Sequence, residues 1–144
     1  GPSRDDGEFA FGGGALAPTG EIVFAPFESS RVGVYDPATN RYTSGSPHSG
    51  GEFAFRGATL APTGEIVFTP AASSNVGIYD PATDSYSAGP SHGEGAFAFN
   101  GATLVPTGEV IFAADESSNI GVVDTNAQTR KARVTALHPL INNS

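Results

Sequence analysis

Two histidines, each followed closely by a glutamate, are candidates for binding a ligand or a metal ion. His48 precedes Glu52, His92 precedes Glu94, and the two histidines are 44 positions apart. Imidazole nitrogens and carboxylate oxygens can bind a divalent ion such as Zn²⁺. The sequence shows none of the tight His or Cys spacing that metal sites use, so we expect no metal and no other cofactor. These four residues remain candidates for ligand binding, and the alternative is a solvated loop histidine beside a glycine turn.

Serine pairs could supply a nucleophile, and they occur at 29–30, 73–74 and 117–118. No Gly-x-Ser-x-Gly elbow surrounds any of them, and a single catalytic triad would not need the same serine in three copies. Serine hydroxyls in loops commonly form hydrogen bonds with the local backbone. We therefore expect these serines to have a structural role.

Two series of carboxylates recur with the same spacing and could in principle hydrolyse glycosides. The residues are Glu21, Glu65 and Glu109, and Asp36, Asp80 and Asp124. A glycosidase needs its two carboxyl groups in different environments, so that one of them stays protonated. Symmetric copies work against that difference, and turn capping explains these residues better. The sequence thus predicts no catalytic residue and no enzyme activity.

The composition describes a chain of 144 residues, enough for one ordinary domain. It contains 19 Gly and 11 Pro, yet 38% of its residues are hydrophobic. This mixture is typical of short strands joined by tight turns. Cysteine is absent, which excludes disulfides and thiolate metal sites and leaves the compartment open.

The chain is acidic, with a net charge of −8, and three of its seven basic residues are Arg130, Lys131 and Arg133. A nucleic-acid interface needs a broad basic face, so we expect no nucleic-acid partner. No apolar run approaches the roughly 20 residues that span a bilayer, so we expect no membrane partner.

Three repeats organise the chain. Phe-Ala-Phe opens them at Phe9, Phe53 and Phe97, and Pro-Thr-Gly-Glu recurs at the same step of 44 residues. The boundaries that follow are 1–8 for a lead-in that begins with a Gly-Pro-Ser protease scar, 9–52, 53–96 and 97–134 for the repeats, and 135–144 for a C-terminal tail.

Each repeat predicts four short strands in one antiparallel sheet. In the second repeat the strands are expected at 53–60, 65–68, 75–80 and 85–90. Pro-Thr-Gly and Asp-Pro-Ala-Thr form the turns after the first and third strands. No stretch has the 3.6-residue period of a helix.

Alternation along the first strand indicates how the sheets stack. Phe53 and Phe55 share one face, while Ala54 and Arg56 lie on the other. The large face of one sheet can then pack against the small face of its neighbour. Four-stranded sheets stacked in this way, with a repeat of about 40–50 residues, are the blades of a β-propeller. We therefore predict an all-β fold of three blades.

The segments "VYDPATNRY" and "IYDPATDSY" resemble the kelch repeat, in which Tyr-Asp-Pro precedes an aromatic residue seven positions after the tyrosine. Tyr42 and Tyr86 stand at that aromatic position. The chain departs from the kelch pattern because no Gly-Gly pair follows the second strand of a repeat and because the usual tryptophan is absent. The resemblance implies a propeller used mostly for protein or sugar recognition and occasionally as an enzyme scaffold.

A propeller would place the candidate residues on one face and in a central channel. The histidines and their glutamates belong to the longer loops of the top face, where binding residues concentrate. Arg56 and Asn100, which are equivalent to Gly12, belong to the first strands that line the channel. We expect any ligand, a protein or a sugar, in one of these two places.

Three blades predict a chain that does not work alone. Propellers close with about four to eight blades, and the open ends of this chain would present a Phe-bearing face and an Ala/Gly-bearing face. A homodimer would have six blades, the size we favour, and a homotrimer would have nine. The third repeat should be the terminal blade, with "TRKARV" at 129–134 as its outer strand.

The sequence therefore favours a self-assembling, non-enzymatic propeller fragment that serves as a structural or recognition scaffold. The alternative is a lectin-like or protein-binding module, and a fragment of a propeller enzyme is a more distant one. The asymmetry of the top loops favours recognition. The near-identity of the first two repeats favours recent duplication or design without a dedicated ligand.

Overall fold

The chain forms three four-stranded antiparallel sheets, which confirms the predicted all-β class. The computed structural model describes residues 2, 4, 7–125 and 134–139. No helix in this part of the chain is long and apolar enough to span a bilayer. The strands are β1 (Phe11–Leu16), β2 (Ile22–Pro26), β3 (Arg31–Asp36), β4 (Arg41–Pro47), β5 (Phe55–Leu60), β6 (Ile66–Pro70), β7 (Asn75–Asp80), β8 (Ser85–Ser91), β9 (Phe99–Leu104), β10 (Glu109–Ala114), β11 (Asn119–Asp124) and β12 (Val134–Pro139).

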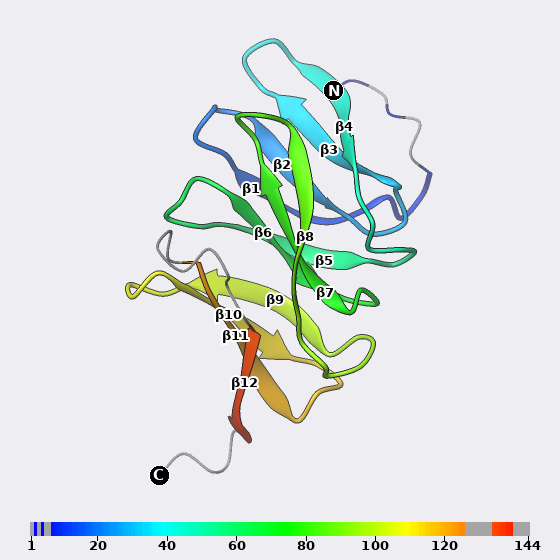
Figure 1. Ribbon diagram of the computed structural model, residues 1–144. Coiled ribbons are helices and arrows are strands. Elements are labelled where there is room, and N and C mark those ends of the chain that lie inside the picture. The colour runs from blue at the N-terminus through cyan, green and yellow to red at the C-terminus, as the bar shows by residue number, and fades with distance from the viewer. Residues whose placement is uncertain (1, 3, 5–6, 126–133, 140–144) are drawn as a thin grey trace.

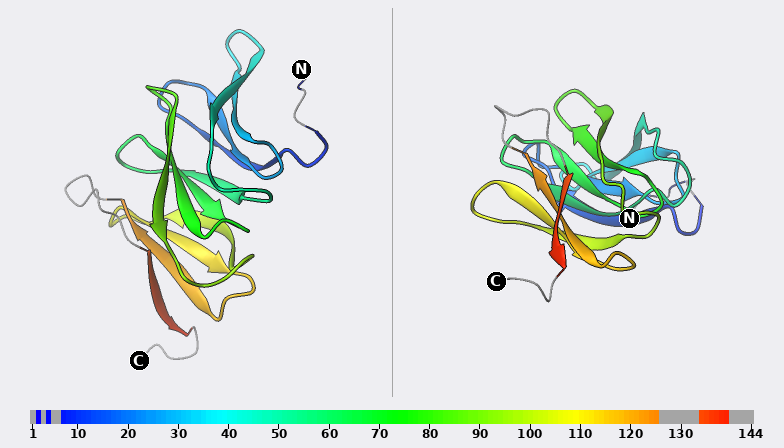
Figure 2. Two further views of the ribbon diagram at one scale, coloured as in Figure 1. Left: turned by 45° about the vertical axis from the view of Figure 1, so that its right-hand side comes forward. Right: turned by 60° about the horizontal axis from the view of Figure 1, so that its bottom comes forward.

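The three sheets stand in a row, with the N-terminal sheet at one end and the C-terminal sheet at the other (Figure 1). Within each sheet the strands are ordered as in the sequence, from the first strand to the fourth. The first strands β1, β5 and β9 contact one another in sequence, and two further views show the same stacking (Figure 2). This is the arrangement of propeller blades, whose sheets stand around a central channel. We call the three sheets blades 1, 2 and 3.

The Asp-Pro-Ala-Thr turns have the geometry that their residues predicted. The carboxylate of Asp36 accepts a hydrogen bond from the backbone N–H of Ala38 at 2.9 Å, and Asp80 accepts the equivalent bond at 3.0 Å. Asn40 and Asp84 end these turns with φ of 52° and 51°. Asn and Asp are the non-glycine residues that best tolerate this left-handed conformation.

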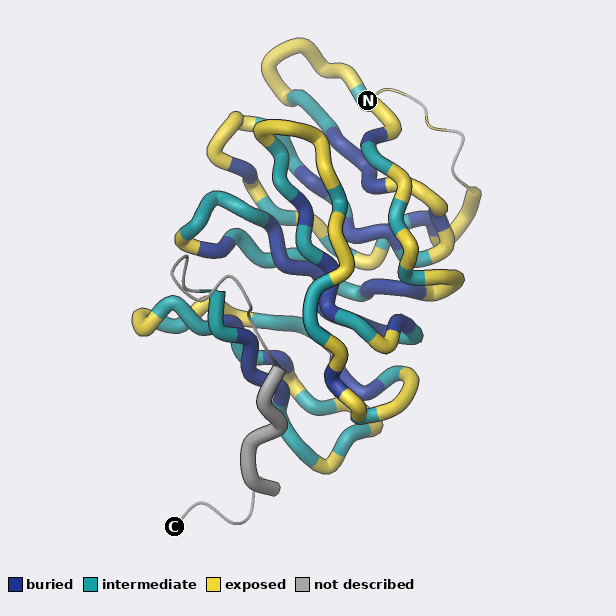
Figure 3. The backbone as a smooth tube through the Cα atoms, in the orientation of Figure 1, coloured by how far each residue is buried: buried dark blue, intermediate teal, exposed yellow. Residues whose placement is uncertain are grey.

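Each blade packs an aromatic face against an aliphatic face of the blade before it. The predicted alternation at 53–56 is wrong, because Phe53 precedes β5 with a φ of 51° and is exposed, while Ala54 lies in the same buried cluster as Phe55. One buried cluster joins blades 1 and 2 and includes Val23, Val32, Phe55 and Phe68. A second cluster joins blades 2 and 3 in the same way and includes Val67, Val76, Phe99 and Phe112. Figure 3 shows the buried residues concentrated in the strands. The junction between blades is therefore the hydrophobic core of the chain.

A β-bulge in the first strand re-aims one side chain of the blade. The register of β1 shifts around Gly12, which stands outside the regular ladder, and the register of β5 shifts around Arg56 in the same way. A bulge bends the strand and interrupts its two-residue alternation. The sequence placed Arg56 on the face opposite Phe55 by simple alternation. Because Arg56 lies in the bulge, alternation does not determine where its side chain points.

The third blade ends later in the sequence than we predicted. Its fourth strand, β12, covers Val134–Pro139 and pairs with β11. The predicted outer strand at 129–134 lies outside the described residues except for Val134, and the boundary of the tail at 135 is wrong because the strand continues. Gly121 pairs with Ala136, 15 positions later, whereas the equivalent pairs in blades 1 and 2 are 11 positions apart. The longer connection moves the strand into "VTALHP", whose β-branched and apolar residues suit a strand better than "RKAR" does.

Candidate functional site

His48 is a structural part of the junction between blades 1 and 2. Its Nδ1 accepts a hydrogen bond from the backbone N–H of Gly50 at 3.1 Å. Because Nδ1 is the acceptor, Nε2 carries the proton and donates to the carbonyl oxygen of Ser29, 2.7 Å away. The imidazole also packs edge-on against the ring of Phe55, with 5.7 Å between centroids. Both ring nitrogens of His48 are therefore used within the chain.

His92 repeats this arrangement at the junction between blades 2 and 3. Its Nε2 lies 3.0 Å from the carbonyl oxygen of Ser73, and its Nδ1 accepts from the N–H of Glu94 at 3.1 Å. Its ring packs edge-on against Phe99 at 5.4 Å. A neutral imidazole with both nitrogens hydrogen-bonded has no lone pair left for a metal ion. Among the described residues, no group of three His, Asp or Glu side chains could hold a metal ion.

The two candidate glutamates have different surroundings. Glu52 is exposed. The carboxylate of Glu94 accepts hydrogen bonds from the hydroxyl of Ser117 at 2.6 Å and from the amide of Asn119 at 3.2 Å. These two donors hold the pKa of Glu94 below its ordinary value, because they favour the charged form. The structure thus does not bring Glu52 and Glu94 together, and ligand binding by either stays a prediction.

Glu94→Gln is expected to reduce the acid sensitivity of the fold. The folded-state pKa of Glu94 lies below the unfolded value, so its stabilisation is complete above about pH 4.5 and is lost as the pH falls through the folded-state pKa. Replacing the carboxylate should flatten the free energy of unfolding below that pH, as measured by urea titration at several pH values. Ser117→Ala, which removes the shorter donor, should flatten the curve in the same direction. An unchanged pH dependence in both variants would contradict this assignment.

Arg56 bridges blades 2 and 3. Its guanidinium Nη1 lies 2.6 Å from Oδ2 of Asp115, and its Cζ lies 5.0 Å from the ring centroid of Phe97. The two charged side chains are 27% and 39% exposed, so water screens their attraction. Asn100, at the equivalent position of blade 3, is exposed. Ligand binding by Arg56 and Asn100 in a central channel stays a prediction.

The repeated serines and glutamates have the structural contacts that their repetition predicted. The hydroxyl of Ser29 donates to the carbonyl of Arg31 at 2.8 Å and accepts from its N–H at 3.0 Å. Ser73 makes the same two contacts one repeat later. The carboxylate of Glu21 accepts from the hydroxyl of Thr19 at 3.1 Å, beside the Pro-Thr-Gly turn. The two serines thus support the backbone of their own loops, and the glutamate contacts a side chain of the turn.

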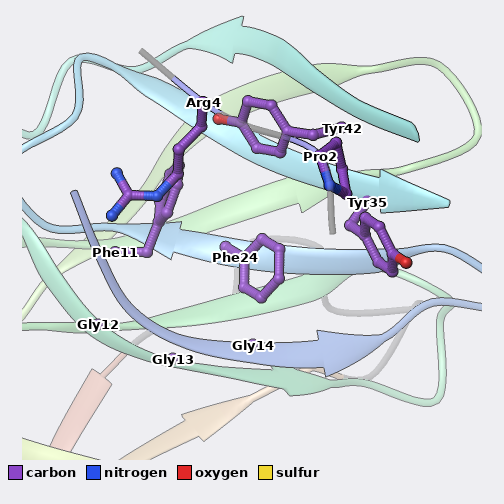
Figure 4. Close-up of a pocket in the computed structure, with 9 residues that line it drawn as sticks. All are labelled: Pro2, Arg4, Phe11, Gly12, Gly13, Gly14, Phe24, Tyr35 and Tyr42. Carbon is purple, nitrogen blue, oxygen red and sulfur yellow. The ribbon is translucent and has the colours of Figure 1, made fainter. Parts of the chain in front are cut away.

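The predicted Phe-bearing open face is present on blade 1, and it is hollowed by a cavity of about 550 Å³ (Figure 4). Four aromatic side chains line the cavity, namely Phe11, Phe24, Tyr35 and Tyr42. The rings of Phe11 and Phe24 stack with 5.5 Å between centroids. The glycines at 12–14 form one wall and contribute no side chains, which leaves the aromatic rings accessible. Sequence reasoning predicted this face but not the hollow in it, which depends on the spacing of the rings.

The aromatic residues of this face are less buried on blade 1 than their equivalents on blades 2 and 3. Phe24 is half-buried, whereas its equivalents Phe68 and Phe112 are 0% exposed. Tyr35 is half-buried, whereas Tyr79 is 2% exposed. Burial and a hydrogen bond to Asp84 raise the pKa of Tyr79 above its ordinary value. Blades 2 and 3 each have a preceding blade on this face, and in this single chain blade 1 has none.

The opposite end of the row shows the complementary difference. On the outward face of blade 3, Ile111 and Ile120 are half-buried and Ala113 is exposed. Their equivalents in blade 1 are 0% exposed, because blade 2 covers them; these are Val23, Val32 and Ala25. Val122, in the next position of this face, stays buried. Among the described residues, blade 1 thus has a partly exposed aromatic face and blade 3 a partly exposed aliphatic face. The second face carries isoleucine and valine, so the predicted Ala/Gly-bearing composition is wrong.

Solved structures with a similar fold are known, although no protein-family model and no curated protein matches the sequence. A streptogramin B lyase is similar over 89% of this chain and 40% of its own, with a TM-score of 0.73 and 19% identity. The virginiamycin B lyase of Staphylococcus aureus is similar over 90% and 42%, with a TM-score of 0.69 and 17% identity. A putative gluconolactonase is similar over 87% and 48%, with a TM-score of 0.66 and 15% identity.

These three structures are β-propeller-like proteins, and the likeness shows that this chain has the fold of propeller blades. The chain spans less than half the length of each of them. At identities of 15% to 19% the likeness concerns the fold and not the chemistry. The finer kelch-type assignment stays a prediction.

Proposed function

We propose that this chain is a self-assembling set of propeller blades, a non-enzymatic scaffold that closes a ring through head-to-tail contacts between identical copies. One observation carries the proposal. Aromatic residues that are half-buried on blade 1 are buried on blades 2 and 3, and aliphatic positions that are partly exposed on blade 3 are buried on blade 1. The chain thus shows twice, in its own core, how these two faces fit together.

The size of the ring follows from the number of blades. Propellers close with about four to eight blades, so three blades leave a gap. Complementary head-to-tail faces generate closed rings when the rotation between copies permits. Two copies would form a six-bladed ring, which we favour, and three copies would form a nine-bladed one. A ligand, a protein or a sugar, would then bind on the top loops or in the central channel.

The contacts of the polar residues support a scaffold without catalysis. The imidazoles of His48 and His92 are hydrogen-bonded at both nitrogens, and each holds a blade linker against a top loop. The hydroxyls of Ser29 and Ser73 are bound to the backbone of their own loops. A general base or a nucleophile needs an atom that can reach a substrate, and these groups are occupied.

Blocking one face at a time tests the proposal. Phe24→Asp places a carboxylate on the aromatic face, and Ile111→Asp places one on the aliphatic face. A charge buried without a partner should weaken the junction about a hundredfold or more. We expect each variant alone to have the 14.6 kDa mass of one chain in light scattering.

Mixing the two variants provides the sharper test. The Phe24→Asp chain retains its aliphatic face, and the Ile111→Asp chain retains its aromatic face. One native junction can therefore form between the two variants. The mixture should contain a species with twice the 14.6 kDa of one chain and nothing larger, which also shows that both variants are folded. Ser87→Asp on the exposed outer strand of blade 2 is the control and should assemble like the native chain. Single variants that keep the native mass, or a mixture that stays at one chain, would overturn the proposal.

A further inference from the structure

Arg4 occupies, in the lead-in to blade 1, the position that a histidine occupies before blades 2 and 3. Arg4, His48 and His92 are separated by the same step of 44 residues that separates the blades. Each of the three stands seven positions before the first aromatic of a first strand, which is Phe11 in blade 1. The repeat therefore begins before residue 9, and the lead-in contains the equivalent of a blade linker.

The three side chains also lie against equivalent rings. The Cζ of Arg4 is 5.6 Å from the ring centroid of Phe11, and the imidazoles of His48 and His92 are 5.7 Å and 5.4 Å from their rings. Arg4 donates hydrogen bonds to the carbonyl oxygens of Gly7 and Glu8, at 2.5 Å and 3.4 Å. A guanidinium has five N–H donors, so further donors remain for another acceptor.

The two histidines show what this position does at a junction. His48 donates to the carbonyl of Ser29, and His92 donates to the carbonyl of Ser73, in the top loop of the blade before the linker. The third member of that serine series is Ser117, in the top loop of blade 3. At a head-to-tail junction, blade 3 of one copy precedes blade 1 of the next.

We propose that Arg4 latches the junction between copies by donating to the backbone carbonyl of Ser117 in the second copy. This inference rests on the proposed self-assembly and identifies one polar contact between the assembled copies. The guanidinium of arginine is a hydrogen-bond donor, as the Nε2–H of the two histidines is. Arg4 can therefore donate to the same kind of backbone carbonyl as His48 and His92 do. The loop of Ser117 is acidic, because Glu116 follows Asp115 there and Glu94 accepts from the Ser117 hydroxyl. An arginine suits this loop better than a neutral imidazole does, since opposite charges attract across an interface.

Two substitutions of Arg4, one to alanine and one to histidine, test the latch. Arg4→Ala should raise the dissociation constant of the assembly about tenfold or more, because it removes the charged donor of the proposed hydrogen bond. Arg4→His should stay within about threefold of the native value, because the residue of the other two junctions is restored. Arg41→Ala, on an exposed outer strand, changes the net charge equally and should leave the dissociation constant unchanged. Sedimentation at several concentrations measures all three.

The outcomes separate the latch from the assembly itself. If the native chain assembles and Arg4→Ala assembles as tightly, the latch is wrong and the proposed function stands. If the native chain has the mass of one chain, the proposed function fails and the latch fails with it. Because the chain has no cysteine, Arg4→Cys combined with Ser118→Cys gives an independent check with a short bis-thiol cross-linker. We expect covalent multimers, and a failure to cross-link in an assembled sample would contradict the latch.

Discussion

Gly12→Ala is expected to lower the free energy of unfolding by about 3 kcal/mol, the largest loss that we expect from adding a single methyl group. A Cβ at Gly12 would lie 2.6 Å from Cα of Arg56 and 2.8 Å from the carbonyl oxygen of Phe55. Both atoms belong to the backbone of β5, which cannot rotate away as a side chain can. The methyl group would therefore push the first strands of blades 1 and 2 apart.

Gly13→Ala is the matched control for this prediction. A Cβ at Gly13 would lie 3.4 Å and 3.5 Å from its nearest neighbours, close to ordinary contact distances. Its effect should stay within about 1 kcal/mol, partly because alanine restricts the unfolded chain. Urea unfolding of the two variants measures the difference. Equal stabilities would show that β1 and β5 are not in backbone contact at Gly12.

Gly77→Ala is the second large effect, and we expect a loss of about 2 kcal/mol. A Cβ at Gly77 would lie 2.9 Å from both the Phe55 and the Phe68 rings, and both rings are 0% exposed. Neither ring can move without opening the core between blades 1 and 2. The equivalent change, Gly33→Ala, places a Cβ 2.7 Å from Cζ of Phe11, but that ring lines the open cavity and can move into it.

The stability losses at Gly33 and Gly77 are best compared in a chain that cannot assemble, because no second copy then covers the Phe11 ring. In the Ile111→Asp background we expect Gly33→Ala to cost less than about 1 kcal/mol. With both faces intact, the displaced Phe11 ring would obstruct the incoming blade, so Gly33→Ala should weaken the proposed assembly. Equal losses at Gly33 and Gly77 in the blocked background would mean that the Phe11 ring is as confined as the Phe55 ring.

Much of the fold could be predicted from sequence because its determinants are local and repeated. The Asp-Pro-Ala-Thr turns needed a residue that tolerates positive φ, and Asn40 and Asp84 adopt it. The stacking of an aromatic face on a face of smaller residues was predicted, but the alternation at 53–56 was not, because Phe53 lies before β5 and a bulge follows Phe55. The boundary of the third blade was wrong because the longer β11–β12 connection breaks the step of 44 residues on which the assignment depended.

The candidate site was predicted less well, because the direction of a side chain depends on contacts between blades. The spacing of His48 and His92 indicated a recurrent role, but only their hydrogen bonds to Ser29 and Ser73 show that the role is to hold linkers. Arg56 belongs to a bulge, so its pairing with Asp115 could not be deduced from alternation. Arg4 lies 44 residues before His48, but it is not a histidine, so the repeat of histidines does not identify it.

Light scattering of the native chain after gel filtration tests the central claim most directly. If the open faces of blades 1 and 3 pack together between copies, the mass at micromolar concentration will be two or three times the 14.6 kDa of one chain. Two copies would support a six-bladed ring and three copies a nine-bladed one. A folded, stable species of 14.6 kDa at that concentration would contradict the account, because both hydrophobic faces would then be stable in water.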